Sequence, residues 1–109
     1  MNNKELDLTL DEIRKAQMVI AVQMGNMDLN AGEKLRLEQS TLHLRNMERS
    51  LVASVEKNLV GDLRKESAEL NLLIAEMKKT SDRLFQVIPV LKKIVKIAGS
   101  VVKVAELVK

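Results

Sequence analysis

LVGDLRKESAELNLLIAEM, residues 59–77, begins a series of apolar positions that continues almost to the end of the chain. The positions alternate in steps of four and three residues, and only Glu66 and Thr80 are polar. This spacing is typical of one face of a helix that packs in a left-handed coiled coil. We call this series the seam, and its apolar members are Leu59, Leu63, Leu70, Leu73, Met77, Leu84, Val87, Leu91, Ile94, Ala98, Val101, Ala105 and Val108.

The helix that carries the first part of the seam is expected to begin well before it. Apolar residues from Leu51 to Leu63 step by four instead, which indicates a local change of register near Gly61. Glycine inside a helix costs only about 1 kcal/mol relative to alanine. No stronger breaker occurs before Thr80, so we expect one helix over residues 31–79. At 1.5 Å per residue it would be about 70 Å long.

A shorter helix is expected near the N-terminus, over residues 9–24. Thr9 and Glu12 have the spacing of a capping box, in which each side chain accepts a hydrogen bond from a free backbone N–H. Leu8 and Ile13 flank them at the spacing of a hydrophobic staple. These signals predict that the helix begins at Thr9.

The stretch GNMDLNAG, residues 25–32, is the clearest loop signal. Gly25 and Asn26 are residue types that end helices. Asn30 and Glu33 repeat the capping-box spacing. We therefore expect the first helix to end at this loop and the second to begin directly after Asn30.

Two arrangements are compatible with the sequence after Thr80. Ser81 and Asp82 could cap a separate helix over residues 82–108 that folds back on the long helix. Alternatively, the long helix continues and kinks at Pro89, because proline lacks an N–H and clashes with the preceding turn. Segment lengths favour the fold-back, and either arrangement places a turn or kink at residues 80–89.

Composition agrees with a single all-α domain over residues 1–109. Hydrophobic residues make up 46% and charged residues 30%, whereas Phe85 is the only aromatic residue. Such a composition is typical of long helices and coiled coils. We predict an elongated helical hairpin or coiled-coil bundle with a short N-terminal helix, one long helix and a C-terminal amphipathic helix. Because a hairpin leaves much apolar surface exposed, we also predict a homo-oligomer.

The tail, residues 88–109, has an apolar arc that covers about half of a helical wheel. A two-helix seam needs a narrower arc. One explanation is packing against two neighbouring helices, and the other is insertion into a membrane interface, since the tail resembles cationic membrane-active peptides in composition. In the second case the contacts to lipid headgroups, or to an acidic partner, would come from Lys92, Lys93, Lys96 and Lys103.

Catalytic chemistry has little support in the sequence. The chain lacks cysteine and has one histidine, His43, with no partner at helical spacing, so we interpret it as a surface or interface residue. Glu66 is expected at the edge of the seam with its carboxylate in water. No phosphate-binding loop, catalytic triad or zinc spacing is present. We expect no enzyme, and no catalytic, cofactor-binding or metal-binding residues.

The sequence favours a non-enzymatic structural or adaptor protein that self-associates through the seam. Two alternatives stay open: a membrane-binding or pore-forming-like protein that uses its lysine-rich tail, and a small helical regulator of another protein. Nucleic acid is disfavoured because only Arg83 among the residues after position 65 is an arginine and no aromatic ring follows Phe85. Without an apolar leader or a long uncharged run, the expected location is the cytoplasm, with peripheral membrane association as the alternative.

Overall fold

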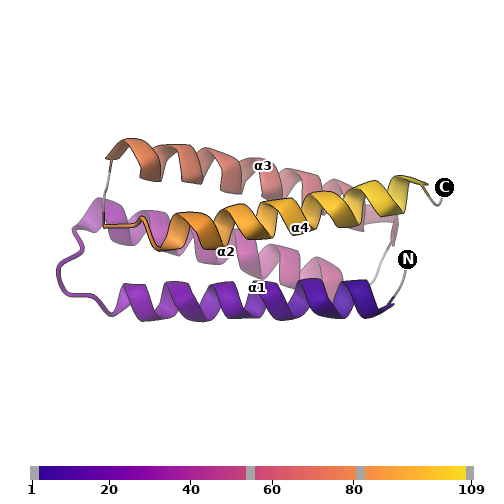
Figure 1. Ribbon diagram of the computed structural model, residues 1–109, viewed down its shortest axis with the longest axis horizontal. Coiled ribbons are helices and arrows are strands. Elements are labelled where there is room, and N and C mark those ends of the chain that lie inside the picture. Colours follow the sequence, from indigo (N-terminus) through magenta and orange to yellow (C-terminus); the bar gives the residue numbers. More distant parts are fainter. Residues whose placement is uncertain (1–2, 54–55, 81–82, 108–109) are drawn as a thin grey trace.

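The computed structural model describes residues 3–53, 56–80 and 83–107, and it confirms the all-α prediction. The described residues form four antiparallel helices, α1 (Asn3–Met24), α2 (Ala31–Ala53), α3 (Glu56–Thr80) and α4 (Val87–Leu107) (Figure 1). Each helix contacts the next one along the chain, and α4 contacts α1. The helices thus form a closed four-helix bundle that measures 47 × 22 × 18 Å.

The single long helix expected over residues 31–79 is wrong. α2 ends at Ala53, α3 begins at Glu56, and the two helices lie side by side in opposite directions. Residues 54 and 55, between them, lie outside the described residues. The irregular spacing around Leu51 and Leu59 spans this reversal. Folding back lets the apolar faces of both helices join one core, whereas an extended helix would leave them exposed.

The predicted start of the first helix is also wrong. α1 begins at Asn3, six residues before the expected cap, and Thr9 is buried within the helix. Leu8 is 57% exposed, so it does not form the predicted staple with Ile13. The helix extends further because Leu6 already packs against the core. Burial of an apolar side chain therefore outweighs the local capping signal.

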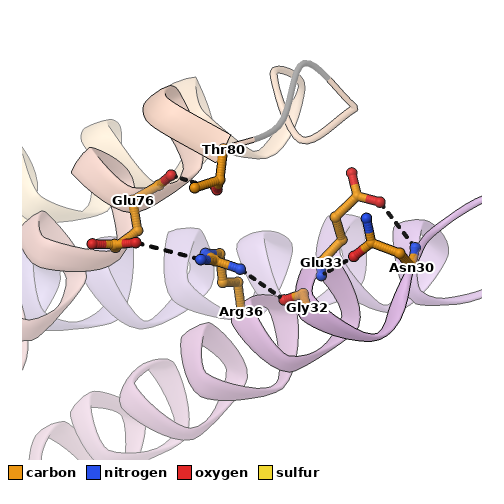
Figure 2. A network of polar contacts seen from close by, with 6 residues as sticks. All are labelled: Asn30, Gly32, Glu33, Arg36, Glu76 and Thr80. Carbon is orange, nitrogen blue, oxygen red and sulfur yellow. Dashed lines mark hydrogen bonds and ion pairs between the residues drawn. The ribbon is translucent and has the colours of Figure 1, made fainter.

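The loop between α1 and α2 confirms both predictions made for it. α1 ends at Met24, directly before Gly25. The Asn30 backbone N–H donates to Glu33 Oε1 at 2.9 Å, and the Glu33 N–H donates to Asn30 Oδ1 at 2.8 Å. Figure 2 shows this reciprocal capping box at the start of α2.

The start of α2 is tied to the end of α3 by a short chain of polar contacts (Figure 2). Arg36 donates through Nη1 to the Gly32 carbonyl at 3.1 Å and through Nη2 to Glu76 Oε2 at 3.3 Å. Thr80 Oγ1 donates to the Glu76 carbonyl at 2.7 Å. The contacts connect the capped end of α2 with the last turn of α3.

The chain turns between α3 and α4, which is the fold-back arrangement. Ser81 and Asp82, the expected caps, lie outside the described residues, and α4 begins later than expected, at Val87. Pro89 is the third residue of α4. In the first turn of a helix a backbone N–H has no intrahelical partner, so proline removes no hydrogen bond there. Pro89 thus starts a helix and does not kink one.

The wide apolar arc of the tail is explained by its two neighbours. α4 packs against α3 on one side and α1 on the other. Its buried residues are flanked by half-buried Val95 and Ile97, which cover the edges of the arc. No described helix has the length and apolar content required to cross a bilayer.

Candidate functional site: a polar layer and two opposite faces

The described members of the seam lie inside a single bundle. Leu73 and Ala105 are half-buried, and Val108 lies outside the described residues. The buried members are Leu59, Leu63, Leu70, Met77, Leu84, Val87, Leu91, Ile94, Ala98 and Val101. Because α3 and α4 contact each other within one chain, these side chains are part of its own hydrophobic core.

A partly buried polar layer joins α2 and α3. Glu66 is only 6% exposed, so the prediction that its carboxylate lies in water is wrong. His43 Nδ1 lies 2.5 Å from Glu66 Oε2, and Asn46 Nδ2 donates to Glu66 Oε1 at 3.2 Å. Sequence reasoning missed this pairing because the partners are brought together only by the chain reversal after Ala53.

The polar layer continues one turn further along both helices. Ser50 Oγ lies 3.0 Å from Asp62 Oδ2 and 3.0 Å from the Asn46 carbonyl. Among the described residues, every buried side-chain nitrogen and oxygen has a hydrogen-bond partner. Within the same part of the chain, no three histidine or carboxylate side chains are arranged to hold a metal ion. A hydrogen-bonded layer of this kind fixes the alignment of two helices, since sliding either one would leave its polar groups unpaired.

The outer side of α3 and α4 carries two antiparallel rows of exposed residues. Each row follows the 3-4 spacing of a helix face. Arg64 forms an ion pair with Glu106 at one end, and Lys78 lies beside Lys92 at the other. We call these two rows the basic face, and its residues are Arg64, Ala68, Asn71, Ala75, Lys78, Lys92, Lys96, Gly99, Lys103 and Glu106.

The basic face has an excess of positive charge. Four lysines and one arginine share it with a single carboxylate, Glu106, which Arg64 already engages. The neighbouring Lys78, through a side-chain hydrogen bond and charge repulsion, lowers the pKa of Lys92. Two ammonium groups therefore lie close together, and a bound anion would offset their repulsion.

The four lysines predicted to make contacts do not form one set. Lys92, Lys96 and Lys103 belong to the basic face, whereas Lys93 is directed towards α1. Its Nζ lies 3.1 Å from Glu12 Oε2. The hydrogen bond from Lys93 lowers the pKa of Glu12 below its ordinary value of 4.5. Lys93 thus connects α4 to α1 within the bundle.

The outer side of α1 and α2 contains an open groove of about 720 Å³. Met18 and Leu42, 69% and 55% exposed, are its most prominent apolar residues. We call it the α1–α2 groove, and it is lined by Arg14, Gln17, Met18, Ala21, Met24, Glu38, Thr41, Leu42 and Arg45. Sequence reasoning did not find it, although Leu35 and Leu42 are spaced by seven residues and share one side of α2.

The charged rim of this groove is partly paired. Arg14 Nε donates to Glu48 Oε2 at 2.9 Å, and Gln17 Nε2 donates to Glu48 Oε1 at 3.0 Å. These hydrogen bonds hold the pKa of Glu48 below its ordinary value of 4.5. Glu38 and Arg45 have no hydrogen bond or ion pair with any described residue, although the charge of Arg45 also lowers the pKa of Glu48.

The α1–α2 groove and the basic face lie on opposite sides of the molecule. The ring of contacts runs from α1 through α2 and α3 to α4 and back, so the two helix pairs face away from each other (Figure 1). No protein-family model, curated protein or solved structure matches the chain. The candidate sites therefore rest on the geometry of these residues.

Proposed function

We propose that the protein is a non-enzymatic adaptor that binds an anionic membrane surface through its basic face. The observation that carries the proposal is the distribution of charge on this face, where five cationic side chains accompany one carboxylate. Small residues such as Ala68, Ala75 and Gly99 lie between the cations. The ammonium groups are therefore the parts of this face best able to reach another surface.

Anionic lipid headgroups are better binding partners for these cations than nucleic acid is. Four of the five cations are lysines, which act as point charges and need no bidentate geometry. The basic face also lacks aromatic residues that could stack on bases. Near an anionic bilayer each basic residue contributes about 1 kcal/mol, so we expect weak, reversible and salt-sensitive binding.

The protein is expected to lie on the membrane with α4 still folded in the bundle. The apolar arc of α4 is covered by α1 and α3, so insertion would first have to separate these helices. Adsorption through exposed lysines requires no such change. Adsorption of the folded bundle thus costs less free energy than insertion of α4.

Vesicle co-sedimentation tests this proposal. The wild type should pellet with vesicles that contain phosphatidylserine, and it should stay in the supernatant with phosphatidylcholine alone. Replacing Lys92, Lys96 and Lys103 by glutamine should remove most of the binding. The matched control replaces Lys4, Lys15 and Lys34 on α1 and α2, which gives the same net charge.

The control triple variant should retain most of the wild-type binding. Equal loss in both triple variants would show that net charge matters and the basic face does not. Absence of wild-type binding to anionic vesicles at low salt would contradict the membrane proposal, and an acidic protein would then be the better partner for this face.

Self-association through the seam stays a prediction. Since its described members are largely buried within one chain, two chains could share the seam only by exchanging helices. An assembly of folded bundles would need an outer surface. A regulatory role towards another protein likewise requires an exposed site.

A further inference from the structure

One outward row of α2 combines apolar residues with charges of both signs. Leu42 is at its centre, with Glu38 four residues before it and Arg45 three residues after it. All three side chains are exposed and line the α1–α2 groove. Leu35 and Arg49 extend the row at the same 3-4 spacing, and both are exposed.

This row is complementary to itself. When two copies of a helix pack antiparallel about a two-fold axis near Leu42, position 38 of one copy faces position 45 of the other. The axis creates the same contact twice. Glu38 of each copy therefore meets the partner's Arg45, and Leu42 meets the partner's Leu42.

We propose that the α1–α2 groove is the contact surface of a symmetric homodimer, with two Glu38–Arg45 ion pairs on either side of a Leu42–Leu42 contact. Met18 and Ala21 of α1 would add apolar area beside Leu42. The arrangement would have an apolar centre and a charged rim, as protein interfaces commonly do. The proposal goes beyond membrane binding and does not depend on it.

A second copy fits this surface because its charges match without any foreign partner. Glu38 and Arg45 form no hydrogen bond or ion pair with a described residue, and Arg45 acts on Glu48 only through its charge. Docking would therefore break no existing ion pair. The helices are 22 and 23 residues long, which gives a face about 34 Å long. An area on the order of 600 Å² per copy is at the lower end for specific interfaces, so we expect a concentration-dependent dimer.

Charge reversal with mixing tests the dimer. The wild type should change from monomer to dimer with rising concentration in analytical ultracentrifugation. Glu38→Arg alone should weaken dimerisation more than about tenfold, since each of the two pairs becomes repulsive, and Arg45→Glu alone should do the same. An equimolar mixture of the two variants should form a heterodimer, because each repulsive pair is replaced by an attractive one.

The controls separate this surface from the rest of the molecule. Glu69→Arg, the same reversal at an exposed site on α3, should leave dimerisation unchanged, and so should Lys96→Glu on the basic face. Recovery in the mixture also excludes misfolding as the cause of the single-variant result. A wild type that stays monomeric, or single variants that are not rescued by mixing, would overturn the proposal; neither result would bear on vesicle binding.

Discussion

The two outer faces of the bundle share one helical framework but differ in the polarity and charge of their side chains. Each is made of two antiparallel rows of exposed residues on adjacent helices. On the α1–α2 side, Met18 and Leu42 form an apolar centre with charges of both signs around it. On the α3–α4 side the cations lie among small residues. Packing inside the bundle is thus compatible with either surface, because the inward rows form the core and the outward rows are free to differ.

The largest effect is expected from a substitution in the core that both faces share. Leu70 is fully buried, so Leu70→Ala should lower the free energy of unfolding by about 3 kcal/mol through lost contacts and a cavity. Leu72, two residues away and 63% exposed, is the matched control. Leu72→Ala should change stability by less than about 0.5 kcal/mol. Urea denaturation measures both, and equal effects would contradict the assigned orientation of α3.

The next largest effect is expected in the polar layer, which aligns α2 with α3. Glu66→Leu removes the carboxylate that engages His43 and Asn46, and it should cost about 1 kcal/mol because these partly buried polar groups lose their partner. His43→Leu combined with Glu66→Leu should recover part of that loss. Thermal unfolding followed by circular dichroism is sufficient. A double variant that is less stable than both single variants would show that His43 and Glu66 each stabilise the fold by more than the hydrogen bond between them.

A smaller, pH-dependent effect is expected at the rim of the α1–α2 groove. Arg14 and Gln17 hold the pKa of Glu48 below 4.5, so the folded state favours the ionised carboxylate. This stabilisation is complete above the unfolded pKa and disappears as the pH falls through the lower folded value. Glu48→Gln should therefore cost about 0.5 kcal/mol at neutral pH and nothing in strong acid. Denaturant titrations of the wild type and the variant across this pH range, with Glu69→Gln as control, measure the difference in the free energy of unfolding. A difference that persists in acid would show that Glu48 acts by packing instead.

The smallest effect on stability is expected at Lys78, on the basic face. Lys78→Gln removes the ammonium group that lowers the pKa of Lys92, so the melting temperature should stay the same or rise slightly. Binding to anionic vesicles should fall about fivefold, as expected for the loss of one basic residue. A raised melting temperature together with weaker vesicle binding would show that Lys78 contributes to binding and not to stability. A fall in both would indicate that Lys78 supports the fold instead.

The sequence predicted what depends on neighbouring residues. The capping box at Asn30 and the end of α1 before Gly25 follow from local backbone chemistry, and both are confirmed. The all-helical fold followed from the 3-4 spacing of the seam and the scarcity of rings. The same local reasoning failed at Thr9, where burial of Leu6 extends the helix.

The features that were missed depend on residues far apart in the chain. No strong breaker marks the reversal between Ala53 and Glu56, so local propensity favoured one uninterrupted helix. Without that reversal, His43 has no partner and Glu66 resembles an exposed acid. The α1–α2 groove was missed for a related reason, since a row of exposed residues becomes a surface only when its neighbouring helix is known. For the same reason the sequence predicted Lys92, Lys96 and Lys103 of the basic face but not the row on α3 beside them.

The cyclic order of the helices has a consequence for the folding reaction. Three of the four interfaces join helices that are consecutive in the chain, so they can form as hairpins from local contacts. Only the contact between α1 and α4 requires opposite ends of the sequence to meet, and the start of α1 and the end of α4 lie at the same end of the bundle (Figure 1). Helical proteins with such sequence-local contacts fold in microseconds to milliseconds. The docking of α4 on α1 is then the step with the largest entropic barrier, and Lys93 and Glu12 are positioned at that junction.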